Sequence, residues 1–254
     1  MSLEAIIPDN NNKKSPLVIV SSPYSHLGYL PDIMDLEKNS SLIFVNFTGY
    51  DGKWEIQNLA ADIENFRKEK IGKKINMLGH CFGGTVIQKY AAMYPESVDK
   101  IILANTSAGR PRISKDIMIK MALFGITAMF KKDQKEYFLE NYFSRFKNIY
   151  LKEQKEEHIA KINLSYDDSD AGFIRRMQTV LKKDKSLDLD AEKINCYTLI
   201  ICSEYDALVP KEEILRTKKA IKNSKLAIVY AGHFSFIEKP HEFNEAVGNF
   251  LGEK

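Results

Sequence analysis

Short runs of aliphatic residues recur along the chain, and most are continuous rather than alternating with polar residues. Continuous runs are typical of strands in a parallel sheet covered on both faces. They predict strands at 3–7, 17–20, 42–45, 74–78, 100–104, 197–202 and 225–230. Apolar spacings of three and four residues predict helices at 55–71, 85–94, 211–221 and 240–251. Strands that alternate with helices predict an α/β fold with a mostly parallel sheet of about seven strands, flanked by helices.

One long stretch interrupts this alternation. Residues 106–188 hold no clear strand, but they contain apparent helical segments rich in Ile, Leu, Met, Phe and Tyr. An insertion of this size does not fit inside a sheet, so we expect it to lie on top as a helical lid. We therefore predict an α/β core of residues 1–107 and 189–254, with a lid of residues 108–188 and an apolar cleft between them.

The composition is that of an ordinary globular protein, and it argues against a nucleic-acid-binding protein and a membrane-spanning protein. Hydrophobic residues make up 44% of the 254 positions and charged residues 28%, and the net charge of +3 is too small to indicate nucleic-acid binding. The longest apolar run of the expected lid, 121–130, is far shorter than the roughly 20 residues that cross a bilayer. No charged segment followed by an apolar one opens the chain, so we expect no secretion signal and no integral membrane segment.

The three cysteines and five histidines show neither a disulfide framework nor the spacing of metal ligands. We therefore expect no metal, no other cofactor, and a reducing, cytoplasmic compartment. The expected partner is a small-molecule substrate, and nothing in the sequence indicates an oligomeric state.

The most distinctive stretch covers residues 77–86. It leaves a predicted strand, turns through Gly79-x-Cys81-x-Gly83-Gly84 and enters a predicted helix. This is the pattern of a nucleophile elbow, with a thiol where the usual pattern has a serine hydroxyl. The glycines are needed because side chains on either side of the nucleophile would collide in so sharp a turn. Read alone, the pattern fits a buried structural thiol beside a turn equally well.

An acid and a histidine follow two later strands. Asp206 comes after the strand at 197–202, and His233 comes after the strand at 225–230. Either residue alone could be a turn residue or a surface histidine. Because parallel strands bring their carboxyl ends to one edge of the sheet, we expect both residues to lie close to Cys81. The order nucleophile, acid, histidine then predicts a catalytic triad.

These motifs resemble those of the α/β-hydrolase superfamily, and the resemblance extends over residues 15–254. It rests on the elbow, on the acid loop Asp206-x-x-Val-Pro210, and on the histidine loop from Gly232-His233 to Glu238-x-Pro240. It implies an α/β-hydrolase fold in which the strand at 100–104 is the family's strand 6, with the lid inserted after it. Only one strand fits before the strand at 17–20, so we expect the family's first strand to be missing.

The resemblance also implies roles for individual residues. Cys81 corresponds to the nucleophile, His233 to the base, and Asp206 to the residue that orients the base. The oxyanion hole would use the backbone N–H of Phe82, the residue after the nucleophile. The residue before Tyr24 is a proline and has no N–H, so the second donor would come from Tyr24, Ser22 or a side chain, and we take Tyr24 as the candidate.

The cysteine departs from the usual serine of the superfamily. Cysteine elbows occur in dienelactone hydrolases and polyhydroxyalkanoate synthases, and residues 78–85 are similar to the nucleophile box of the synthases. We expect His80, the neighbour of Cys81, to pack or to form a hydrogen bond rather than to react, because its side chain should point away from the nucleophile.

Sulfur restricts the chemistry that we expect. Beside His233 and at a helix N-terminus, the thiolate of Cys81 should have a pKa below the free value of about 8.5. A thiolate is also a good leaving group, so its adduct with a plain alkyl ester tends to expel the thiolate again. We therefore predict a hydrolase that acts on a thioester, lactone or activated ester with a fairly apolar acyl group, through an acyl-cysteine intermediate.

Three alternatives remain open at this point. An acyltransferase, condensing or cyclising enzyme would use the same acyl-cysteine intermediate with an acceptor other than water. A ligand-binding pseudoenzyme would keep the pocket without turnover. The third alternative is a serine esterase in which Cys81 stands in place of the native serine.

Overall fold

The structure is a computed structural model, and it describes residues 4–6, 14–20, 33–47, 50–109, 156–157, 180, 191–206 and 208–253. Nearly all of the predicted lid, residues 108–188, lies outside these ranges, and so does Tyr24. The division into core and lid therefore stays a prediction.

The described residues form a seven-stranded sheet with the order β1-β3-β2-β4-β5-β6-β7. Its strands are β1 (Glu4–Ile6), β2 (Ser15–Val20), β3 (Ser40–Asn46), β4 (Ile75–His80), β5 (Val98–Ala104), β6 (Tyr197–Ser203) and β7 (Ser224–Val229). β1 pairs with β3 antiparallel, and all the other neighbouring strands of this sheet are parallel. Every strand predicted from an apolar run is thus confirmed, including the one short strand before β2.

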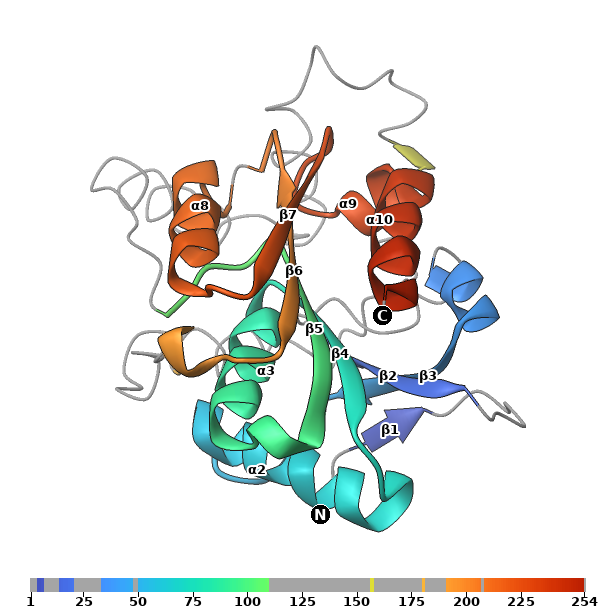
Figure 1. Cartoon of the computed structure of the whole chain (residues 1–254), viewed down its shortest axis with the longest axis vertical. Helices are drawn as coiled ribbons and strands as arrows, with labels where there is room; N and C mark the ends of the chain where they lie inside the picture. Colours follow the sequence, from blue (N-terminus) through green and yellow to red (C-terminus); the bar gives the residue numbers. More distant parts are fainter. Residues whose placement is uncertain are drawn as a thin grey trace, which may run out of the picture.

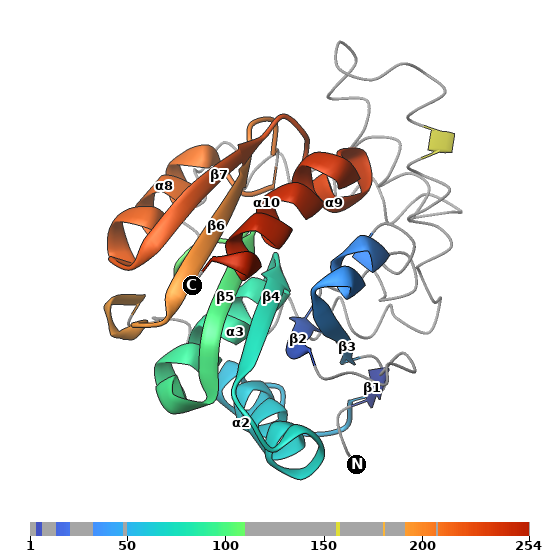
Figure 2. The ribbon, with the colours of Figure 1, turned by 45° about the vertical axis from the view of Figure 1, so that its right-hand side comes forward.

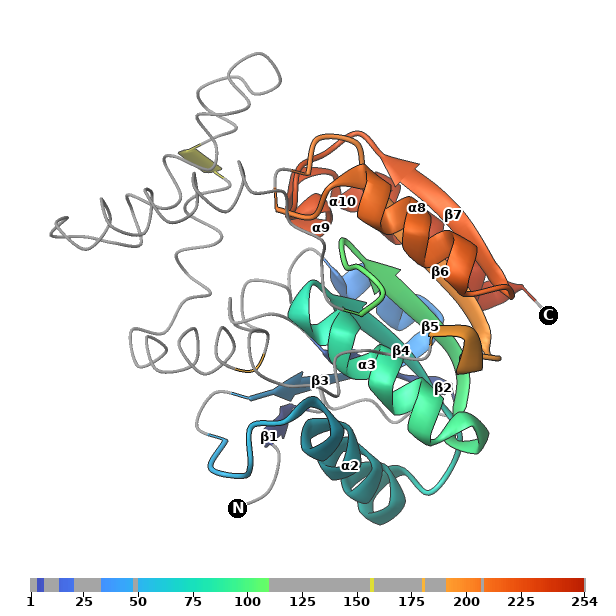
Figure 3. The same cartoon turned by 90° about the vertical axis from the view of Figure 1, so that its left-hand side faces the viewer.

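Helices cover both faces of the sheet (Figures 1 and 3). They are α2 (Ile56–Phe66), α3 (Phe82–Met93), α8 (Lys211–Ala220), α9 (Ser235–Glu238) and α10 (Pro240–Gly252). α2, α3 and α8 pack on one face, whereas α9 and α10 pack on the other, together with the 3-10 turn Met34–Lys38. Figure 2 shows α10 on the side of the sheet away from α3. Among the described helices, none is both long and apolar enough to cross a membrane.

Successive residues of one strand belong to two separate cores. In β2, Val18 and Val20 pack with the residues of α2, α3 and α8. Leu17 and Ile19 pack with the residues of α9 and α10. Because side chains of a strand point alternately to opposite faces, burial of both faces requires an uninterrupted apolar run. This is why the strands were recognisable in the sequence.

The helix after the elbow begins earlier than we predicted. The sequence pattern indicated a start at residue 85, but α3 begins at Phe82, directly after Cys81. The difference arises because the backbone of Cys81, with a φ of 51°, makes the turn by itself. Gly83 and Gly84 consequently lie in the first turn of the helix rather than in the preceding loop.

The predicted helix at 55–71 changes character before its end. The α-helical part, α2, stops at Phe66, and the chain continues through one π-helical turn, Arg67–Ile71. Gly72 ends this turn with a φ of 71°, a conformation that glycine adopts without steric cost. The segment leads directly into β4 and so to the elbow.

Candidate active site

Four strands deliver polar residues to the carboxyl edge of the sheet. Cys81 follows β4, Asn105 follows β5, Asp206 lies just beyond β6, and His233 lies just beyond β7. These strands are adjacent and parallel, so their carboxyl ends lie side by side. The edge is where parallel α/β sheets place their ligands, because loops there are free to vary while the sheet stays rigid.

Cys81 occupies a strained turn between β4 and α3. Its backbone has φ 51° and ψ −116°, a combination that residues with a side chain rarely adopt. Two backbone hydrogen bonds hold it there. The Cys81 N–H donates to the carbonyl of Ala104 at 3.0 Å, and the Cys81 carbonyl accepts from the N–H of Thr85 at 3.3 Å. The half-buried side chain is therefore presented at a fixed point of the carboxyl edge.

Gly79 and Gly84 allow α3 to lie close against the elbow. A Cβ atom on Gly79 would lie 2.6 Å from the Cα of Gly84, a distance that real Cβ atoms do not tolerate. A Cβ atom on Gly84 would in turn collide with the side chain of Thr106, just beyond β5. The steric reason inferred for the glycines thus holds at Gly79, whose contact is with the backbone of the helix that follows.

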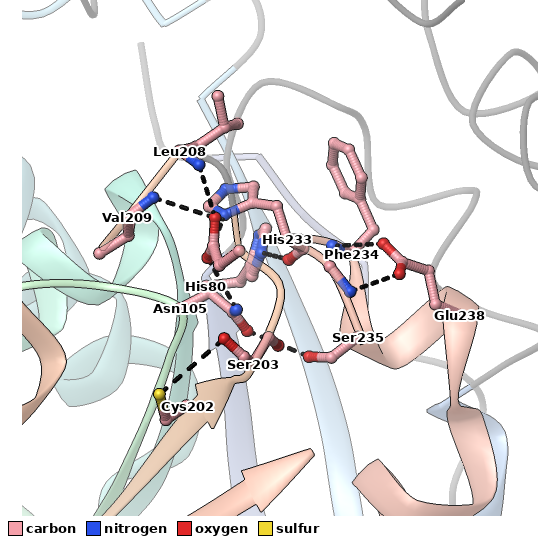
Figure 4. A network of polar contacts seen from close by, with 12 residues as sticks. His80, Asn105, Cys202, Ser203, Leu208, Val209, His233, Phe234, Ser235 and Glu238 are labelled. Atoms are coloured by element: carbon pink, nitrogen blue, oxygen red, sulfur yellow. Dashed lines mark hydrogen bonds and ion pairs between the residues drawn. The ribbon is translucent and has the colours of Figure 1, made fainter. Parts of the chain in front are cut away.

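His233 lies between Cys81 and Asp206. Its Nδ1 is 2.8 Å from Oδ2 of Asp206 (Figure 4 shows the polar contacts around the His233 ring). The ring is also hydrogen-bonded to the side chain of Cys81. Since Nδ1 is engaged by Asp206, Nε2 is the ring nitrogen left for the thiol. The structure therefore brings together the three side chains that the sequence suggested as a triad, from three different loops at the carboxyl edge.

The charges in this group favour a protonated imidazole. Burial alone lowers the pKa of His233, but the negative charges of Asp206 and of an ionised Cys81 outweigh it and raise that pKa above its ordinary value. Burial disfavours the charged form of Asp206 as well and by itself would raise its pKa. The charge of His233 and the hydrogen-bond donors around the carboxylate outweigh burial, so the pKa of Asp206 is lowered. A thiolate, an imidazolium and a carboxylate in a row are the arrangement that stabilises an ionised cysteine nucleophile.

Four donors fix the carboxylate of Asp206. Its Oδ1 accepts from the backbone N–H groups of Leu208 and Val209, at 2.8 and 2.9 Å. Its Oδ2 accepts from the Asn105 side-chain amide at 2.9 Å in addition to His233. Since the side chain is only 1% exposed, water does not compete with these contacts. The acid is thus held in one orientation before any substrate binds.

Asn105 is a site residue that the sequence reasoning missed. It is fully buried, has a φ of 51°, and its Oδ1 accepts from the hydroxyl of Ser235 at 3.0 Å. A signal for it was present, because Asn105 is a polar residue directly after a buried strand, as Asp206 and His233 nearly are. Asparagine also tolerates a positive φ better than most residues. The same rule that found the acid and the histidine would therefore have found Asn105.

His80, next to the nucleophile, points toward the histidine loop. Its Nε2 donates to the backbone carbonyl of His233 at 2.8 Å, and the two rings lie 4.6 Å apart between centroids. Burial, together with the nearby charge of His233, lowers the pKa of His80 to about 3. His80 is therefore a neutral donor that packs and forms a hydrogen bond, as we expected for this position.

Phe82, the expected oxyanion-hole residue, is the first residue of α3 and follows Cys81 directly. The first N–H groups of a helix point out of its N-terminus, where the helix dipole favours negative charge. Its expected companion Tyr24 is outside the described residues. Within the described ranges, no three side chains of the metal-ligating types gather into a possible metal site.

The sequence profile of the family described as "alpha/beta hydrolase fold" matches residues 35–240. This chain belongs to that family. The match spans the elbow, the acid loop and the histidine loop, and it therefore includes the residues at the carboxyl edge of the sheet. Membership is consistent with an enzyme of the hydrolase type, which the resemblance of its motifs implied.

Two curated relatives match about the same share of this chain. RutD of Caulobacter sp. (strain K31), provisionally named a carbamate hydrolase, is 28% identical over 183 residues, which are 70% of this chain and 66% of RutD. A provisionally named 2-succinyl-6-hydroxy-2,4-cyclohexadiene-1-carboxylate synthase of Bacillus subtilis (strain 168) is 26% identical over 197 residues, again 70% of this chain and 66% of the relative. The matched stretch thus spans just under two thirds of either relative.

A solved structure agrees with the fold over nearly the whole hydrolase. The enol-lactonase from Burkholderia xenovorans LB400 superposes with a TM-score of 0.76 and 18% identity, covering 99% of this chain and 96% of the lactonase. At this identity the likeness establishes the common fold and leaves the substrate open.

Proposed function

We propose that this hydrolase cleaves an activated, fairly apolar acyl substrate (a thioester, a lactone or an activated ester) through an acyl-cysteine intermediate on Cys81. His233 is the base and acid of the reaction, and Asp206 orients His233. The observation that carries the proposal is the strained backbone of Cys81 beside an imidazole that is itself bonded to a buried carboxylate.

The first half of the reaction forms the acyl-enzyme. The Cys81 thiolate attacks the carbonyl carbon, and the carbonyl oxygen takes up the negative charge. The tetrahedral adduct then collapses, the leaving thiolate or alkoxide departs, and the imidazolium of His233 gives it a proton from Nε2. The N–H of Phe82 is the proposed donor to the oxyanion, with Tyr24 as the second.

The second half releases the product. Neutral His233 takes a proton from water at Nε2 while the water oxygen attacks the acyl-cysteine. The thiolate of Cys81 leaves, the acid is released, and the protonated imidazole again faces a thiolate. Asp206 stays ionised throughout and stabilises the imidazolium through the contact with Nδ1.

The nucleophile defines the substrate class. When the leaving group is a plain alkoxide, the tetrahedral adduct expels the thiolate of Cys81 instead, and the substrate is regenerated. Thioesters, enol lactones and aryl esters carry leaving groups that compete with the thiolate. The name of the enol-lactonase with the same fold is consistent with this class.

Intact-mass spectrometry tests the proposal directly. After exposure to an acyl thioester such as S-phenyl thiobutyrate, the wild-type chain should gain the mass of one butyryl group at Cys81. Cys81→Ala and His233→Ala should abolish the adduct, and Asp206→Asn should slow its formation without unfolding the protein. If His233→Ala acylates as fast as wild type, the proposed triad is wrong.

Cys81→Ser distinguishes the native thiol from a substituted serine. A strong rise in the hydrolysis of plain esters in this variant would mean that the site is a serine esterase carrying the wrong nucleophile. A chain that forms no adduct with any activated acyl donor would be a ligand-binding pseudoenzyme. The proposal expects neither result.

Acyl transfer, condensation or cyclisation is the second candidate. It is favoured by the energetic thioester of the intermediate and by the relative from Bacillus subtilis, whose name is that of a synthase. An adduct that persists in water and is discharged only after an alcohol or amine is added would establish transfer.

Two further expectations belong to the proposal. One is that the acyl group arrives on a thioester carrier. The other is a cytoplasmic location, where the thiol of Cys81 would stay reduced. No disulfide joins any two of the three cysteines, all of which lie in the described part of the chain.

A further inference from the structure

The backbone around His233 is held by a buried carboxylate that the proposed reaction does not use. Oε2 of Glu238 accepts from the N–H of Gly232 at 2.5 Å, and Oε1 accepts from the N–H of Phe234 at 3.1 Å (Figure 4). One side chain thus binds the peptide groups immediately before and after the histidine. Glu238 is the last residue of α9, the short helix that begins two residues after His233.

The third backbone contact of this loop comes from the opposite direction. The carbonyl of His233 accepts from Nε2 of His80, at the end of β4 and next to Cys81. The N–H groups at positions 232 and 234 are therefore bound on the α9 side, and the carbonyl at 233 is bound on the elbow side. Together these contacts determine where the Cα–Cβ bond of His233 points, and hence where its ring can meet Cys81.

Burial makes these contacts hard to replace. Glu238 is 7% exposed and Phe234 is 1% exposed, so water has little access to the peptide groups between them. Burial raises the pKa of Glu238 to about 7, although the two N–H donors act in the opposite direction. Burial of a carboxylate is unfavourable for folding, and the two N–H donors offset only part of that cost.

We propose that Glu238 is a positioning residue for His233, which acts by holding the peptide groups on both sides of the histidine so that the imidazole stays in contact with Cys81. The inference rests on the proposed triad. A carboxylate is required because both partners are donors. The amide of glutamine has one acceptor oxygen, and its NH₂ group would face the second N–H.

The test uses two variants and one control of the same residue type. Glu238→Gln keeps the volume and removes one acceptor, whereas Glu238→Asp keeps the charge on a side chain that is one methylene shorter. Glu242→Gln is the control, because Glu242 lies on α10, four residues further on, with a side chain that is 50% exposed. The readouts are the rate of acylation by S-phenyl thiobutyrate and the pH dependence of Cys81 alkylation by iodoacetamide, with the modified cysteine identified by peptide mass.

We expect Glu238→Gln to lower both rates at neutral pH by about tenfold and to move the midpoint of Cys81 alkylation to higher pH, since the thiolate loses its aligned imidazolium. Glu238→Asp should give intermediate rates, and Glu242→Gln should match wild type. Should Glu238→Gln fail to fold, Glu238→Asp decides the question with the same readouts. A Glu238 variant that folds with wild-type rates and an unchanged midpoint would overturn the proposal.

A double-variant cycle separates positioning from general stability. In the His233→Ala background, Glu238→Gln should change the alkylation rate of Cys81 by less than about twofold, because nothing remains for Glu238 to position. An equal loss in both backgrounds would show that the effect does not pass through His233, and would refute the positioning role. Failure of the proposed function looks different, because His233→Ala alone would then leave acylation and the alkylation profile of Cys81 unchanged.

Discussion

Glu64 and Glu238 are both buried glutamates, but their surroundings differ in kind. Glu64 lies between α2 and α3, where it binds Arg67 through two contacts of 2.8 and 2.9 Å and accepts from the hydroxyl of Tyr90 at 2.6 Å. Its pKa falls to about 2, chiefly through the hydrogen bond with Arg67 and despite burial. Glu238 accepts from the backbone N–H groups of Gly232 and Phe234, and burial raises its pKa to about 7.

The two sites therefore contribute to folding with opposite sign. An ionised Glu64 is stabilised by a cation, so it joins α2 to α3 and supports the layer beneath the elbow helix. An ionised Glu238 is disfavoured by its burial, so the histidine loop is maintained at the expense of stability. Buried polar groups that lower stability are commonly found where a precise geometry is needed for function. With the proposed function, this contrast assigns the α2–α3 layer to stability of the fold and the histidine loop to the candidate active site.

The largest effect should come from Glu64→Gln. At pH 7 this variant should lose about 3 kcal/mol of unfolding free energy, because it removes the carboxylate whose pKa Arg67 lowers from 4.5 to about 2, while the Arg67 cation stays in place. Urea denaturation followed by circular dichroism measures the loss. Acylation of Cys81 per folded molecule should stay at the wild-type rate, and a slower rate would contradict the separation of the two regions.

The pH dependence of stability should sharpen the contrast. The raised pKa of Glu238 adds stability that is fully present below pH 4.5 and is lost as the pH rises through about 7. The difference in unfolding free energy between Glu238→Gln and wild type should therefore shift by about 2 to 3 kcal/mol in favour of the variant as the pH rises from 4 to 8. Urea denaturation across this range measures the gain.

The contribution of Glu64 to stability depends on pH in the opposite direction. Its lowered pKa adds stability that is present above pH 4.5 and is lost as the pH falls toward about 2. The deficit of Glu64→Gln should therefore shrink below pH 4.5 and stay constant between pH 5 and pH 8. Parallel slopes for the two glutamine variants between pH 4 and pH 8 would remove the basis for treating the regions as different.

Asn105→Gly tests whether the hydrogen bond from Asn105 to Asp206 contributes to the reaction. Glycine accepts the φ of 51° without strain, so the variant leaves the backbone unstrained while it removes the amide donor of Asp206 and the acceptor of the Ser235 hydroxyl. We expect the acylation rate of Cys81 to fall about tenfold, which corresponds to one lost hydrogen bond to a charged group. Asn223→Gly, at an exposed asparagine beyond α8, should show no change. An equal fall in both variants would trace the effect to backbone flexibility.

Ser235→Ala should have the smallest effect. It removes the hydroxyl that donates to Oδ1 of Asn105 at 3.0 Å, and thus acts on Asp206 only through Asn105. We expect a rate about two- to threefold below wild type and a stability loss of about 1 kcal/mol. In the Asn105→Gly background the effect on the rate should vanish. Persistence of the full effect there would show that Ser235 acts by another route.

Much of the site was recognisable because its signals are local. The elbow is a short pattern of glycines around Cys81, and Asp206 and His233 each stand just beyond a buried apolar run. What the local pattern did not predict correctly is the start of α3, because a single residue with positive φ replaced a longer loop. Asn105, Ser235 and the two contacts of Glu238 also escaped, although Glu238 belonged to the motif that resembled the family.

The sequence by itself determined the order of the strands and helices, the family, and the residue types at the carboxyl edge. These follow from periodicity and from the constraint that parallel strands end together. Only the tertiary structure decided which buried polar groups meet, such as Asn105 with Asp206 at a separation of 101 residues and His80 with His233 at a separation of 153. The physical reason is that a hydrogen bond between distant residues leaves no periodic trace in the chain. It exists only once the strands that carry both partners lie side by side.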